Sequence, residues 1–109
     1  MSMLENLQKL HAQGQDNALL RYSLGNELFK LKEYAEAEAH LRASLAHDAK
    51  YSVAWKILGK TLAADARHED AVAVFEQGIA VAEEKGDIQA AKEMKVFLKR
   101  SRKALDQAD

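Results

Sequence analysis

The chain has 109 residues, of which 48 % are hydrophobic and 30 % are charged, so one domain with a buried core is expected and a disordered chain is not. It has no cysteine, which excludes disulfides and thiolate chemistry. No stretch approaches the roughly 20 apolar residues of a membrane span, and the N-terminal segment carries charge within its apolar run, so we expect no signal peptide and a cytoplasmic location.

The pattern of residues predicts a chain made of helices. Proline is absent, and Ala, Leu, Glu, Lys and Gln, which are good helix formers, dominate. Connections of two to four residues make sequential helices antiparallel neighbours. The six helices that we expect span about residues 2–13, 16–32, 34–47, 51–65, 68–84 and 87–106.

Glycines and acidic residues mark the expected helix ends. The first helix packs through Met3, Leu7 and Leu10 and ends at Gly14, after which Asp16 can cap the second helix. The fifth helix ends at Gly86. The last has Asp87 as N-cap and a stripe of six smaller or apolar residues that closes the stack: Ile88, Ala91, Met94, Leu98, Ser101 and Leu105.

The sequence repeats itself with a period of 34 residues. Gly25 and Gly59 lie inside predicted helices, where each costs about 1 kcal/mol relative to alanine. Each is followed 12 residues later by Ala37 or Ala71, so we expect these small residues to face each other inside a hairpin, with large residues in the outer seams. The identical pairs are Leu24/Leu58, Gly25/Gly59, Leu28/Leu62, Ala37/Ala71, Ala39/Ala73 and Ala46/Ala80.

These repeats resemble the tetratricopeptide repeat family. The second copy carries Trp55, Leu58, Gly59, Ala71 and Phe75 at the family's spacing, whereas the first has Arg21 in the tryptophan position and Leu41 in the phenylalanine position. The resemblance implies an all-α fold, a right-handed antiparallel helix-hairpin solenoid of two repeats with capping helices. As one domain over 1–109, it would comprise a capping helix (1–16), repeat 1 (18–51), repeat 2 (52–85) and a second capping helix (86–109).

The resemblance also implies a concave groove lined by the first helix of each hairpin. A partner peptide or helix with an apolar anchor and an acidic group would suit this surface, and the protein would act as a non-catalytic scaffold or adaptor. Alternatively, Tyr22 and Phe29 pack against the first helix. The implied groove residues are Tyr22, Asn26, Phe29, Lys30, Val53, Lys56, Lys60 and Ala63, continued on the last helix by Ala90, Met94 and Phe97.

Nothing in the sequence points to a catalytic, metal or cofactor site. His40 and His47 share a helix face with Ser44 between them, but no further ligand, acid or oxyanion donor accompanies them. We expect the four histidines, with His11 and His68, to be solvated or at edges. No enzyme activity, no cofactor, no small-molecule substrate and no membrane partner are therefore expected.

The C-terminal segment supports an alternative function. Residues 85–103 hold 7 Lys or Arg against 2 acidic residues, a balance of +5, although the whole chain has a net charge of −1. Such a helix could contact phosphates, which would make the chain a nucleic-acid-binding accessory protein, or it could meet an acidic protein surface or solvent. No aromatic residue accompanies the charged face to stack on bases. The cations are Lys92, Lys95, Lys99, Arg100, Arg102 and Lys103.

Overall fold

The computed structural model describes residues 2–107, which form an elongated molecule of 45 × 31 × 19 Å. Every element in this range is helical, as the sequence predicts, and the ends agree with the predicted ones within two residues. The helices are α1 (Met3–Ala12), α2 (Ala18–Lys30), α3 (Tyr34–His47), α4 (Ser52–Ala64), α5 (His68–Lys85) and α6 (Ile88–Asp106).

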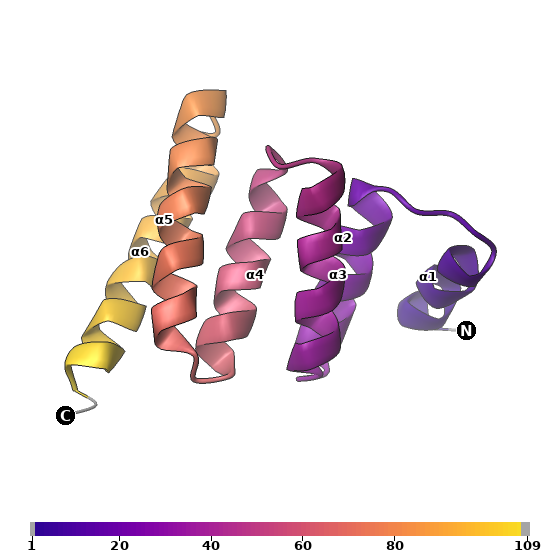
Figure 1. Ribbon diagram of the computed structural model, residues 1–109, viewed down its shortest axis with the longest axis horizontal. Helices are drawn as coiled ribbons and strands as arrows, with labels where there is room; N and C mark the ends of the chain where they lie inside the picture. The colour runs from indigo at the N-terminus through magenta and orange to yellow at the C-terminus, as the bar shows by residue number, and fades with distance from the viewer. Residues whose placement is uncertain (1, 108–109) are drawn as a thin grey trace.

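The helices form two layers of a short solenoid (Figure 1). Consecutive helices pack as antiparallel hairpins, and α4 also contacts both α2 and α6. In contrast, α3 and α5 make no backbone contact with each other within the described chain, and in Figure 1 α3 lies in front of α2 and α5 in front of α6. We call α2, α4 and α6 the inner helices and α3 and α5 the outer helices.

Side-chain caps fix where several helices begin. Ser2 and Glu5 form a reciprocal capping box at α1, and Asp87 accepts from the backbone N–H of Ala90, as predicted, at α6. The predicted N-cap of α2, Asp16, is wrong by one residue. Asn17 is the N-cap, and its side chain accepts from the N–H of Leu20 at 2.8 Å. Asp16 instead pairs with Arg21 and His47, so its carboxylate links α2 to α3.

A residue with a left-handed backbone conformation follows four of the helices. Gly14 and Gly86 have φ of 95° and 83° after α1 and α5, where the sequence predicts them. Lys32 and Ala66, which lie 34 residues apart, adopt φ of 63° and 61° after α2 and α4, although neither is glycine. The N–H of the residue after each reaches back to Leu28 or Leu62, so the same turn closes both inner helices.

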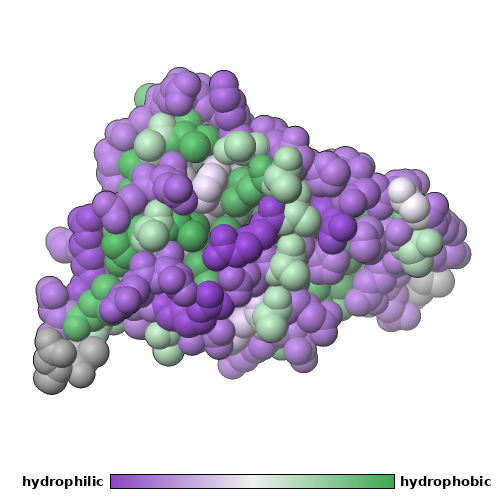
Figure 2. All heavy atoms as spheres, viewed as in Figure 1, coloured by the Kyte–Doolittle hydropathy of each residue, from purple (hydrophilic) through white to green (hydrophobic). Residues whose placement is uncertain are grey.

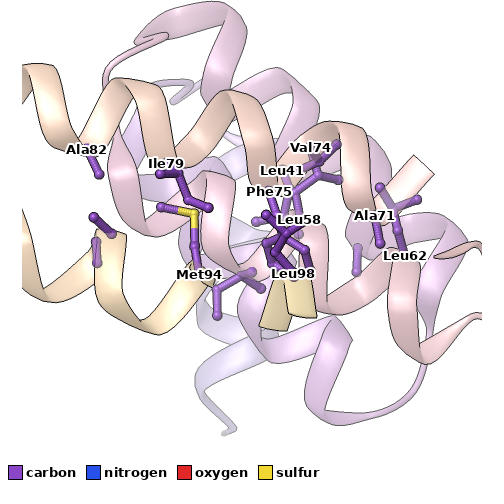
Figure 3. Packing of buried hydrophobic residues seen from close by; sticks show 14 of the residues in the cluster. Leu41, Leu58, Leu62, Ala71, Val74, Phe75, Ile79, Ala82, Met94 and Leu98 are labelled. Carbon is purple, nitrogen blue, oxygen red and sulfur yellow. The ribbon is translucent and has the colours of Figure 1, made fainter. Parts of the chain in front are cut away.

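Large side chains fill the space beside the repeat glycines. An added β-carbon at Gly25 would lie 3.2 Å from the carbonyl oxygen of Ala37, as expected, but the nearest atoms at both glycines belong to larger side chains. A β-carbon on Gly59 would lie 2.6 Å from Cδ1 and Cζ of Phe75, and one on Gly25 would lie 2.5 Å from Cγ of Leu41. Phe75 is fully buried beside Leu58 (Figure 3), so it stands inside the hairpin and not in an outer seam. The glycines thus make room for large residues one helical turn beyond the alanines.

The two terminal helices close the stack unequally. α6 buries Ala91, Met94, Leu98 and Ser101, as predicted, but Ile88 is 66 % exposed. α1 buries no residue. Its packing face is Leu4, Leu7 and Leu10, because Met3, which the sequence assigns to that face, is 60 % exposed. On the face shown in Figure 2, hydrophobic residues gather over α4 and α5, whereas the α1 end is mostly hydrophilic. Within residues 2–107, no helix combines the length and hydrophobicity that crossing a bilayer requires.

Candidate partner-binding groove

The two aromatic residues predicted for the groove on α2, Tyr22 and Phe29, contact residues of α4 and residues at the ends of the neighbouring turns. The Tyr22 ring lies edge-on to Tyr51, which precedes α4, at 5.6 Å between centroids. The Phe29 ring lies 6.2 Å from that of Tyr34, and the Nζ atom of Lys60 stands over it at 5.6 Å. Burial beside Tyr22 raises the pKa of the Tyr51 phenol above its ordinary value. The rings of Tyr22 and Phe29 both remain partly exposed.

A pocket of about 290 Å³ opens between the C-terminal halves of the inner helices. Phe29, Ala63 and Phe97 line it, and these residues are spaced by 34, so they hold the same position on α2, α4 and α6. The middle position carries only a methyl group, so a hollow remains between the two flanking rings, with the Nζ atom of Lys60 near both of them. Phe75 of α5 forms the floor, stacked on Phe97 at 5.9 Å between ring centroids.

Positive charge collects at the rim of this pocket. The Nζ atom of Lys60 lies 5.1 Å from the Phe97 ring centroid, and the guanidinium of Arg100 lies 5.6 Å from the same centroid. Lys56, one turn earlier on α4, donates to Glu93 of α6 at 3.2 Å and is 19 % exposed. The ion pair compensates the charge of Lys56, whose side chain is less exposed than the sequence predicts.

The remaining predicted residues are spread over several places. Asn26 and Val53 are partly exposed on α2 and α4. Lys30 pairs with Glu27 and lines a separate hollow against α1. Ala90 and Met94 do not line the groove, because Met94 is fully buried and Ala90 is 5 % exposed, packed in the core.

Three residues of the pocket rim were missed by the sequence argument. Arg100 was placed on a general charged face, although it lies one turn after Phe97 and so shares its side of α6. His68 and Ser101 contact each other at 3.3 Å between Nδ1 and Oγ, from the start of α5 and the middle of α6. The repeat period does not predict the contact between His68 and Ser101, because in the described chain α6 has no second helix with which to form a third hairpin.

The other histidines join a polar cluster between α1, α2 and α3. Asp16 accepts two hydrogen bonds from the Arg21 guanidinium and lies 3.0 Å from Nε2 of His47, and these contacts hold the pKa of the Asp16 carboxyl far below its ordinary value. His40 contacts Arg21 at 3.1 Å and packs edge-on against His11. Burial, Arg21 and His11 lower the pKa of His40. These histidines are therefore edge residues with partners, and the described residues hold no group of three His, Asp or Glu arranged for a metal ion.

The basic residues of α6 are partly neutralised. Lys95 pairs with Glu83 at 3.0 Å and Arg102 with Glu76 at 3.4 Å, both on α5. These pairs reduce the charge available to phosphates. Arg100, which points to the inner helices, does not belong to the same face.

Stacked antiparallel helix hairpins with an inner surface of this kind define a helical-repeat solenoid, and known proteins carry the same architecture. The chain is 44 % identical over 98 residues to a TPR repeat-containing protein of Pseudomonas aeruginosa, covering 90 % of this chain and 93 % of that one. A solution structure of a protein from Bordetella parapertussis matches with a TM-score of 0.85 at 42 % identity, covering 95 % of this chain and 90 % of that one.

A tetratricopeptide repeat domain protein from Salinibacter ruber also matches, with a TM-score of 0.71 at 27 % identity over 78 % of this chain and 96 % of that one. No family model matches the chain. The Pseudomonas relative is nonetheless similar enough over nearly its whole length that the chain belongs to the tetratricopeptide repeat family. This membership supports a protein–protein interaction module in general terms.

Proposed function

We propose that the chain is a non-catalytic interaction module that receives a peptide or helix of a partner protein along the inner helices. The observation that carries the proposal is the pocket between Phe29, Ala63 and Phe97, which combines exposed aromatic surface with cations at its rim. Partly exposed aromatic side chains are the groups that supply affinity at protein interfaces, and rim charges supply orientation and association rate. The cytoplasm, which the cysteine-free composition suits, is the compartment that we propose for this interaction.

Site-directed photo-crosslinking tests which surface is used. A photoreactive phenylalanine is introduced at Asn26 or Val53, which are partly exposed on inner helices, and as matched controls at Ala39 or Gln77, which are exposed on α3 and α5. A partner captured by the parent chain from extracts of its source organism should crosslink at the inner positions and not at the outer ones. Crosslinks confined to Ala39 or Gln77 would move the working surface to the outer helices and refute the proposal.

Truncation of the aromatic ring measures its contribution. Phe29→Ala should weaken binding of the crosslinked partner by about 2 kcal/mol, the scale of an interface hot spot. The measurement is calorimetric titration, together with a circular dichroism melt that shows whether the variant is folded. Unchanged affinity in a folded Phe29→Ala variant would remove Phe29 from the site.

A further inference from the structure

The pocket between the inner helices is the right size for one side chain. Its volume of about 290 Å³ lies at the lower end of small-molecule sites, which span about 300–1,000 Å³. The repeat itself explains the vacancy, because Ala63 stands where both neighbouring repeats have phenylalanine. Phe29, Phe75 and Phe97 surround the space, so an aliphatic or aromatic side chain would find apolar contacts on three sides.

The charges at the rim are uncompensated. Across the described chain, Lys60 and Arg100 have no carboxylate within ion-pair distance, whereas Lys56 pairs with Glu93 and Arg102 with Glu76. Both cations instead approach the Phe97 ring, so two like charges converge on one apolar surface. The ring holds each cation by cation–π attraction, which pre-organises them for an anion. A carboxylate at this rim would therefore have two cations near it.

We propose that this pocket anchors a partner segment in which one large apolar side chain is followed by an acidic residue. The apolar group fills the space beside Ala63, and the carboxylate bridges Lys60 and Arg100. The inference rests on the proposed function and adds to it the chemistry of the partner. A peptide is the committed occupant, because the apolar lining calls for a side chain and the charge complementarity calls for a carboxylate.

Titration of the full chain with short peptides, followed by amide NMR shifts, tests the specificity. The probe is acetyl-Gly-Leu-Asp-Gly-amide, and the matched probes replace Asp by Asn or Leu by Gly. The acidic apolar peptide should shift amides around Ala63, Phe97 and Arg100 at up to about 10 mM, a range in which millimolar affinity is measurable. Each matched probe should bind roughly tenfold more weakly, as for a lost charged hydrogen bond or apolar anchor.

Three variants test the assigned residues with the same peptide. Arg100→Gln and Lys60→Gln should each reduce its affinity several-fold, whereas Arg102→Gln, on the same helix but paired with Glu76, should not. Ala63→Leu should fill the pocket and abolish the shifts, while Ala39→Leu on α3 should leave them unchanged. A folded state for each variant is checked by its amide spectrum.

Defined outcomes would overturn the inference. Equal binding of the Asp and Asn peptides would contradict the proposed recognition of a carboxylate. The absence of amide shifts at the highest peptide concentration would contradict peptide binding in the pocket. Stronger shifts of the same amides with an oligothymidine than with the peptide would assign the cations to nucleic acid. A partner that crosslinks at Asn26 or Val53 but binds Lys60→Gln and Arg100→Gln normally refutes this inference alone. Crosslinks confined to the outer helices refute the proposed function.

Discussion

Gly59 shows how one missing side chain holds a hairpin together. Its α-carbon faces the fully buried ring of Phe75, and a β-carbon there would clash with Cε1 of that ring and lie 2.6 Å from Cδ1 and Cζ. Gly59→Ala should therefore destabilise the fold by about 1–3 kcal/mol, although alanine is the better helix former. Urea denaturation measures this change. Combining Gly59→Ala with Phe75→Leu should cost less than the sum of the two single changes, and full additivity would disprove the contact.

The cluster around Asp16 and His40 makes stability depend on pH. His40 faces Arg21, His11, Glu36 and Asp16, and its folded-state pKa is lowered by burial and by the neighbouring cations. The unfolded state therefore takes up the proton first, so stability is greatest above 6.5, the ordinary pKa, and falls as the pH drops toward the lowered value. Asp16 adds a second loss below its ordinary pKa of 3.8.

Urea denaturation at pH 7.5 and 5.5 tests this dependence. The parent should be less stable at the lower pH, and His40→Gln should lose less stability over the same interval. An equal loss in both proteins would show that another group carries the dependence.

At the scale of a residue, the sequence predicted the helix on which a side chain lies better than the atoms that it contacts. Asp16 and Asn17 are both good N-caps, and only the positions of Arg21 and His47 decide between them. The spacing put Gly59 against the right helix but did not predict its contact with Phe75, because side-chain direction and axial offset are not contained in a period. Phe29, Ala63 and Phe97 follow the period, so their alignment was predictable, whereas the reach of Arg100 over Phe97 was not.

At the scale of an element, α1 differs from the five helices behind it. It buries no residue, and α2 is the only helix of the described chain with which its backbone is in contact. Its side-chain contacts come from Leu4, Leu7 and Leu10 and from the packing of His11 against His40. Local opening of such an element costs little free energy. Its amide protons should exchange much faster than those of α4 and α5, which lie in the core. Hydrogen-exchange NMR measures this, and equal protection of α1 and α4 would mean that the capping helix is part of the cooperative unit.

At the scale of the whole molecule, the repeat period determined most of the architecture. Two copies of a 34-residue pattern predicted the hairpins and their order, because such faces become buried by stacking, whereas the identity of the inner helices came from the resemblance to the tetratricopeptide repeat family. The period does not extend to α1, and the sequence consequently assigned the wrong residue, Met3, to its packing face. A helix outside the repeats packs through contacts that have no equivalent in the neighbouring copies, so the period does not predict them.

Every backbone contact between helices joins elements at most two apart in the chain, either sequence neighbours or α4 with α2 and α6. Folding of such a chain requires no long loop to close, and proteins rich in local contacts fold quickly. The first hairpin can therefore form while the remainder is still being synthesised, and each later helix finds its docking surface already present. A growing chain of this design offers its apolar faces to other molecules only briefly.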